Sequence, residues 1–134
     1  DFALSGNWYD PATSGQGLTV DVNPGSGTVF AAWYTYAPTG VGAGAAGQRW
    51  YTAQQVSFTP GARTIPVTLY QTTGGIFDLA AVPGAQTVAV GTGTLAFQSC
   101  SAATFSFNFT GGSSSGSSGT IALQRVGPVP KGCV

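Results

Sequence analysis

The stretch "SGNWYDPATSGQG", Ser5 to Gly17, decides the fold. Gly6 and Trp8 open the first apolar segment, and Asp10-Pro11 with the small polar residues behind it ends that segment almost at once. An Asp in this setting organises a turn, because its side chain accepts a hydrogen bond from the backbone two residues on. The stretch therefore predicts a short first strand that ends in a sharp corner.

Outward from this corner, the chain has the periodicity of β-strands. Gly, Pro, Ser and Asn interrupt the apolar segments, and no window holds apolar residues at helical spacing without a Gly or Pro inside it. We predict an all-β protein with the following eight strands: Gly6–Tyr9, Gly17–Asn23, Thr28–Tyr36, Gln48–Val56, Thr64–Gln71, Val88–Phe97, Thr104–Thr110 and Gly119–Val126.

Most of these strands have one apolar and one polar face. In "LTVDV", Leu18 to Val22, and in "TFSFNF", Thr104 to Phe109, apolar and polar residues alternate. The segment "VFAAWYTY" differs because both of its faces are largely apolar, with Phe30, Tyr34 and Tyr36 on the second face. We expect that face to meet either another part of this chain or another copy of it, and these three residues are the candidates for self-association.

The chain has the size of one domain, 134 residues, and we expect a single β-barrel domain over residues 1–134. Its two cysteines are Cys100, at the end of a predicted strand, and Cys133, next to the C-terminus. We predict a disulfide that pins the tail, with two separate buried thiols as the alternative. Closing such a loop stabilises a fold by about 3–4 kcal/mol in the chain-entropy model.

Charge is sparse and balanced. The chain has four Lys and Arg residues and four Asp residues, and it contains no His and no Glu. Nucleic acids and anionic membranes need clustered basic residues, so neither is expected as a partner. No apolar run approaches the roughly 20 residues of a membrane span, which argues against membrane insertion. Asp rather than Met as first residue suggests a mature exported product, and we predict a secreted, extracellular protein, with the periplasm as the alternative.

The first and last strands are expected to close the barrel. Arg125 shares a face with Ile121 and Leu123, so alternation turns it toward the core. A buried guanidinium needs partners, and the indole of Trp8 supplies one by stacking, worth on the order of 0.5–2 kcal/mol. We therefore predict that Trp8 and Arg125 are structural and seal one end.

These features resemble the calycins, the group that contains lipocalins and avidins. The resemblance rests on Gly-x-Trp in the first strand, eight up-and-down strands and Arg125. It implies a closed antiparallel barrel, with a β-sandwich as the alternative. The segment "SGNWYDPATS" is similar to the opening of avidins and implies that Asp10 and Ser14 lie where the ureido group of biotin is bound. The other tryptophans and polar ligands of avidins have no match in the later strands.

A second resemblance covers nearly the whole chain. The pattern Gly-x-Trp-Tyr-Asp-Pro-x-x-Ser-Gly-x-Gly, with "RWYTA", "GTGTLAFQSCSAATFSFNF" and "IALQRV" behind it, looks like a bacterial secreted domain without an assigned activity. It implies export from a bacterium and no particular mechanism.

The composition disfavours catalysis. Without His, Glu or a free thiol, the chain lacks a general base tuned near neutrality, a nucleophilic triad and an ordinary transition-metal site. Asp10 and Asp21 remain as the one carboxylate pair that could act as acid and base. We predict a protein that is not an enzyme and that uses neither a metal nor a cofactor.

Aromatic residues carry the remaining hypotheses. Indoles and phenols among few charges suit sugars or flat organic ligands, while the same rings can simply fill a barrel. We expect a small-molecule or carbohydrate ligand with Asp10, Ser14, Trp33 and Trp50 as the wall of its site. The alternative function is a self-associating subunit of an extracellular filament or surface assembly, which would form homo-oligomers or polymers.

Overall fold

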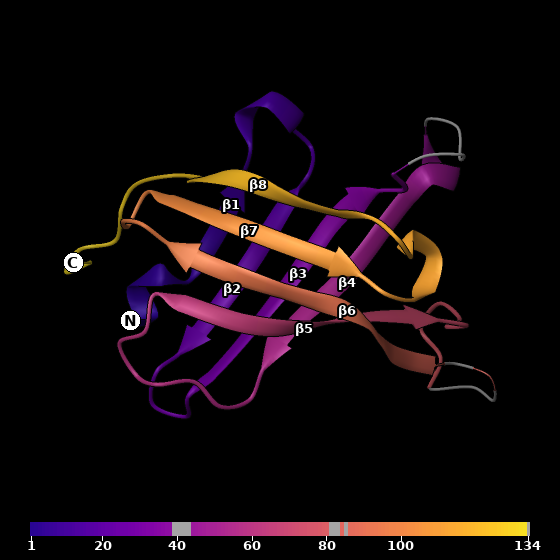
Figure 1. The fold of residues 1–134 in the computed structure, drawn as a ribbon, viewed down its shortest axis with the longest axis horizontal. Helices are drawn as coiled ribbons and strands as arrows, with labels where there is room; N and C mark the ends of the chain where they lie inside the picture. The colour runs from indigo at the N-terminus through magenta and orange to yellow at the C-terminus, as the bar shows by residue number, and fades with distance from the viewer. Residues whose placement is uncertain (39–43, 81–83, 85, 134) are drawn as a thin grey trace.

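The eight strands form a closed antiparallel barrel in which each strand pairs with the next and β8 returns to β1 (Figure 1). This computed structural model describes residues 1–38, 44–80, 84 and 86–133. The predicted all-β, up-and-down barrel is confirmed. The strands are β1 Gly6–Tyr9, β2 Gly17–Asn23, β3 Thr28–Tyr36, β4 Gln48–Gln55, β5 Thr64–Thr73, β6 Gln86–Phe97, β7 Ala102–Phe109 and β8 Ser118–Arg125.

The predicted strand positions hold, with small shifts at the ends. The first three strands have the predicted bounds, and β5 and β6 are each two residues longer at the hairpin that joins them. Thr73 pairs with Gln86 there, so the ladder continues beyond the predicted ends. Four short 3₁₀ turns complete the fold: η1 Phe2–Leu4, η2 Pro11–Thr13, η3 Ala45–Gly47 and η4 Gly112–Ser114.

The loop between β5 and β6 does not plug the barrel in its described part. Phe77 is 96% exposed, and Ile76 and Leu79 are also exposed. Residues 81–83 and 85 of the same loop lie outside the described residues. The buried apolar core consists of strand side chains together with Leu4 of η1.

Alternation along the strands separates a packed interior from a solvent-facing exterior. Leu18, Val20 and Val22 of β2 are buried, as are Phe105 and Phe109 of β7. The predicted inward faces of these strands are thus confirmed.

The second apolar face of β3 is not covered by the described chain. Val29, Ala31 and Trp33 are buried inside, while Phe30, Tyr34 and Tyr36 on the outer face are 47%, 42% and 45% exposed. This face was expected to meet either another part of this chain or another copy of it. The described part of the chain does not cover these three residues. Their rings remain available to a ligand or to another molecule.

Arg125 seals one end of the barrel against Trp8. The two residues are register partners in the β1–β8 pair, and the guanidinium carbon lies 4.6 Å from the indole ring centre. Arg125 donates from Nε to the carbonyl of Cys100 at 2.6 Å, from Nη1 to Ser5 at 2.9 Å and from Nη2 to Ala3 at 2.7 Å. Burial lowers the pKa of this guanidinium below its ordinary value because it removes water from the charged form.

Gly6 is required for this arrangement. Its φ of +143° is rarely adopted by residues with a side chain, and a Cβ atom there would lie 2.6 Å from Arg125 Nη1. In the Gly-x-Trp motif, Gly6 therefore leaves room for the guanidinium of Arg125, and Trp8 supplies the ring on which that guanidinium stacks.

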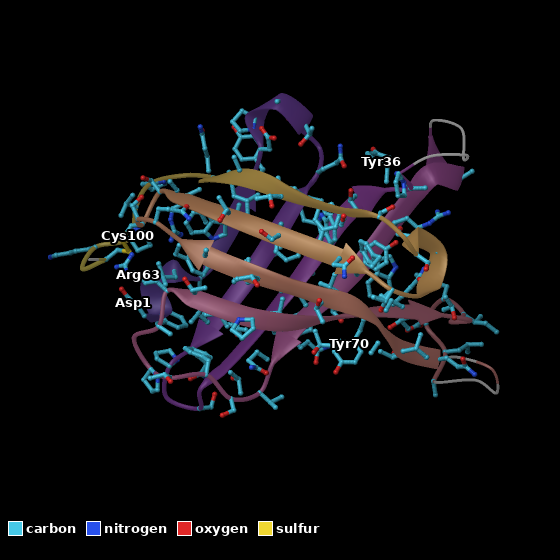
Figure 2. All side chains as sticks on the ribbon, viewed as in Figure 1. Asp1, Tyr36, Arg63, Tyr70 and Cys100 are labelled. Carbon is cyan, nitrogen blue, oxygen red and sulfur yellow. A yellow bond between two sulfur atoms is a disulfide. The ribbon has the colours of Figure 1, made fainter. Side chains whose placement is uncertain are left out.

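The predicted disulfide joins Cys100 to Cys133. Cys100 lies at the same end of the barrel as Asp1, so the bond fixes the C-terminal tail at the sealed end (Figure 2). Within the described residues, no helix has the length and apolar character needed to traverse a bilayer.

Candidate functional site

The barrel wall has an opening where β1 ends early. In the described chain, β1 and β8 pair through Trp8 with Arg125 and Tyr9 with Gln124, while β8 extends back to Ser118 beside β7. At Asp10 the chain leaves the sheet and enters η2, which Figure 1 shows beyond the end of β1. Among the described residues, the first half of β8 therefore has no neighbouring strand on this side.

The local sequence explains why β1 stops. Pro11 lacks the N–H that a strand ladder needs, and Asp10 Oδ1 instead accepts a hydrogen bond from the Ala12 N–H at 2.8 Å. The Thr13 N–H donates to the Asp10 carbonyl at 3.0 Å and completes the turn. The predicted corner is confirmed, and it creates one side of the opening.

A cavity of about 720 Å³ lies at this opening, and we call it the mouth cavity. Its floor is apolar and its rim is polar. The floor is formed by Leu18, Trp33, Tyr51, Phe107, Phe109, Ile121 and Leu123. The polar rim is formed by Asp10, Thr13, Gln16, Thr35, Ser114, Ser117, Ser118 and Thr120.

The floor is built around Trp33. Its ring centre lies 5.6 Å from that of Tyr51, 5.1 Å from that of Phe107 and 5.7 Å from that of Phe109, the last in a stacked arrangement. Phe105 packs edge-on against the same indole, with 5.0 Å between the two ring centres. Aromatic pairs of this kind contribute about 0.5–1.5 kcal/mol each beyond the area they bury, so the floor is held firmly in place.

The rim is fixed on one side by a hydrogen-bonded clasp around η4. The Tyr51 hydroxyl bonds to the hydroxyls of Ser113, at 3.3 Å, and Ser114. Gln71 on β5 donates from Nε2 to Ser113 Oγ at 2.8 Å and accepts the Ser113 N–H at 3.0 Å. Ser114 is only 4% exposed, so its contact with Tyr51 satisfies a buried hydroxyl.

On the opposite side, Gln16 ties η2 to the end of β3. The Thr35 hydroxyl donates to Gln16 Oε1 at 2.8 Å, and the Gln16 N–H donates to the Thr13 carbonyl at 3.1 Å. In the part of the chain that the structure describes, these bonds leave the Gln16 amide nitrogen as a donor at the rim. Asp10 beside it supplies a carboxylate acceptor.

Two of the four predicted wall residues belong to this cavity. Asp10 and Trp33 line it. Ser14 is exposed at the end of η2 and does not line it. Trp50 is 54% exposed on the outer face of the sheet and does not line this cavity. Tyr51 takes the inward position on β4, and with a side-chain period of two its neighbour Trp50 must point outward.

Several cavity residues were not predicted as site residues. The alternation of Phe107 and Phe109 with polar residues indicates that they face inward, but it does not mark them as site residues. Tyr51 is the register partner of Trp33, which its sequence position does not indicate. Ser114 lies in the low-complexity loop after β7, where nothing in the sequence marks a buried hydroxyl.

Another hollow, of about 250 Å³, lies on the outside of the rim, and we call it the rim depression. Tyr34 and Trp50 are direct cross-strand partners there, and Gly15, Thr35, Tyr36, Gln48 and Arg49 complete its lining. Arg49 donates from Nη1 to the carbonyls of Ala46 at 3.0 Å and Gln48 at 2.8 Å. Figure 2 shows Tyr36 at the end of the barrel opposite Cys100.

The two carboxylates that could act as an acid–base pair occupy different places in the described chain. Asp10 lies at the mouth, whereas Asp21 is exposed on β2 opposite Phe30 and does not line the cavity. The two carboxylates considered as an acid–base pair are thus not brought together there. In the described ranges, no three His, Cys, Asp or Glu side chains are grouped as metal ligands would be.

Comparisons with protein-family models, curated proteins and solved structures found no match to this chain.

Proposed function

We propose that this protein is a non-enzymatic, secreted binding module that holds a small uncharged ligand of the carbohydrate class in the mouth cavity. The observation that carries the proposal is the combination of an aromatic floor with a hydroxyl and amide rim. Sugars have apolar C–H faces that pack on rings and hydroxyls that exchange hydrogen bonds with such a rim.

The size and charge of the cavity support this ligand class. Its volume of about 720 Å³ falls in the ordinary range of small-molecule sites, about 300–1,000 Å³. Asp10 is the one charged residue among the described lining residues. A strongly charged ligand would lose its hydration in the cavity without gaining enough oppositely charged partners, so its binding would be unfavourable.

The disulfide supports the secreted location that belongs to this proposal. Disulfides form and persist in oxidising compartments and are rare in the cytosol. The Cys100–Cys133 bond fits an extracellular or periplasmic protein.

Substitutions at the rim test the site. Gln16→Ala removes the rim amide, and we expect about a tenfold weaker Kd for neutral oligosaccharides by isothermal titration calorimetry, equivalent to about 1.4 kcal/mol. Ser14→Ala is the matched control, because Ser14 lies in the same segment but outside the cavity, and it should leave the Kd unchanged. Equal effects of the two substitutions would place the ligand elsewhere.

The charge of the ligand is tested by Asp10→Asn. The amide keeps the acceptor oxygen that bonds to the Ala12 N–H, so the turn is retained. For an uncharged ligand we expect less than about a threefold change in Kd, since only the formal charge is lost. A much larger loss would identify a cationic ligand and contradict the proposal.

Self-association is a second candidate function, favoured by the exposure of Phe30, Tyr34 and Tyr36 on the outer face of β3. It predicts a particle mass that grows with protein concentration. Light scattering over a concentration series separates the candidates, because a binding module should keep a constant mass.

A further inference from the structure

The mouth cavity and the rim depression meet at the end of β3. Thr35 and Tyr36 line both of them, so the two hollows adjoin at the rim. Thr35 faces inward and bonds to Gln16, while Tyr36 faces outward and is 45% exposed. A ligand that leaves the cavity over Tyr36 therefore enters the depression.

The depression presents rings to such a ligand. Tyr34, Tyr36 and Trp50 stand on the outer face of β3 and β4, and we call them the aromatic shelf. Tyr34 and Tyr36 are two residues apart on one strand, about 6.6 Å along it, and Trp50 lies directly opposite Tyr34. All three rings are more than 40% exposed. The strands thus hold a row of apolar surfaces beside the cavity.

The polar groups around the shelf suit the same ligand class as the cavity. Gln48 is exposed there, and Gly15 leaves open space, because a Cβ atom built on it meets nothing within 4 Å. Arg49 is the one charge among the described residues of the depression, as Asp10 is in the cavity. The two charges balance along the combined path, which favours an uncharged chain over an acidic or basic one.

Resting on the proposed function, we infer that the ligand is an extended neutral oligosaccharide chain, with its end in the mouth cavity and its next units on the aromatic shelf. A sugar confined to the cavity would not touch Tyr34 or Trp50, which line only the depression. Chain length is therefore the property that the shelf recognises. The rings add affinity only for chains long enough to cross Tyr36.

The test measures affinity against chain length. Cello-, chito- and xylo-oligosaccharides, each from disaccharide to hexasaccharide, are titrated calorimetrically into the wild type and into Trp50→Ala. In the series that binds, we expect the wild type to bind the hexasaccharide about tenfold more tightly than the disaccharide. Trp50→Ala should lose that gain and keep the wild-type Kd for the disaccharide, while Trp50→Phe should restore part of the gain.

Phe30→Ala is the matched control. Phe30 is also an exposed ring on the outer face of β3, but it does not line the depression, so its substitution should leave the length dependence intact. Melting temperatures of all variants confirm that they fold. Equal losses in Phe30→Ala and Trp50→Ala would overturn the inference.

The outcomes separate this inference from the proposed function. Disaccharide binding with no gain for longer chains overturns the aromatic shelf and leaves the mouth cavity as proposed. No binding of any of the three series overturns both. A particle mass that falls in Trp50→Ala, measured by light scattering, would assign the shelf to a contact between copies and also overturn the inference.

Discussion

At the scale of single residues, the guanidinium of Arg125 joins segments that are far apart in the sequence. Its three hydrogen bonds reach the carbonyls of Ala3 and Ser5 near the N-terminus and of Cys100 after β6. The indole of Trp8 lies against its face and donates from Nε1 to the Leu4 carbonyl at 3.2 Å. The sealed end is thus held by a fork of donors that only arginine supplies.

Replacement of Arg125 should be costly. We expect Arg125→Ala to lower the free energy of unfolding by about 2–4 kcal/mol, because three carbonyls lose a charged donor and the Trp8 ring is uncovered. Arg125→Lys should recover only part of this, since an ammonium lacks the planar fork. Urea unfolding followed by tryptophan fluorescence measures the effect.

Arg49→Ala is the comparison for this experiment. The hydrogen bonds of Arg49 are exposed and local, so we expect less than about 1 kcal/mol there. An unchanged unfolding midpoint for Arg125→Ala would refute its role at the sealed end.

At the scale of elements, the mouth cavity exists because neighbouring elements differ in length. β1 has four residues and β8 has eight, and in the described chain only Gln124 and Arg125 of β8 have register partners in β1, so the rest of β8 extends along the opening. On the other side, the clasp around η4 keeps the loop after β7 in place at the rim. A short strand and an anchored turn together define a cavity that neither would form alone.

The clasp can be tested through its hydroxyl. Tyr51→Phe keeps the ring in the floor but leaves the buried Ser114 hydroxyl without its partner, which should cost about 1–3 kcal/mol. We expect faster hydrogen exchange at the Gly116 and Ser117 amides, whose acceptors lie in or beside this turn.

Tyr70→Phe on β5 provides the control, because no hydrogen bond of its hydroxyl occurs in the described chain. It should exchange like the wild type. Unchanged exchange in Tyr51→Phe would show that η4 is held by its backbone contacts alone.

At the scale of the whole molecule, the two ends of the barrel differ in what they contain. Arg125, Trp8 and the disulfide fix the termini at one end, where Figure 1 shows both N and C, and the residues that line the mouth cavity lie toward the other. The residues that stabilise the termini are therefore separated in space from the proposed binding site. This separation allows rim side chains to change without loss of the fold.

The disulfide should contribute strongly to stability. Its cysteines are 33 residues apart, and a loop of this size restricts the unfolded chain by about 3–4 kcal/mol in the entropic account. We expect reduction, or the double substitution of Cys100 and Cys133 by Ser, to lower the free energy of unfolding by this amount and so to lower the unfolding midpoint. Equal midpoints for oxidised protein and reduced protein, with both thiols titrated, would contradict this expectation.

Much of the fold could be predicted because it depends on local patterns. Alternation in segments such as Gly17–Asn23 fixes which side chains turn inward, and Gly, Pro and Asn mark the turns. The contact of Trp8 with Arg125 followed from the same alternation once the first and last strands were taken as neighbours. The site was predicted only in part, through Asp10 and Trp33.

The sequence by itself determined the all-β class, the order of the strands, the corner at Asp10 and the pairing of two lone cysteines, since each depends on nearby residues or on simple counting. Only the tertiary structure decided that Tyr51 rather than Trp50 faces Trp33 inside the barrel. It also decided that the Ser114 hydroxyl contacts the Tyr51 hydroxyl, and that β8 extends past the end of β1 and so leaves an opening in the wall. These features arise from cross-strand register and closure, which bring together residues that the chain holds far apart.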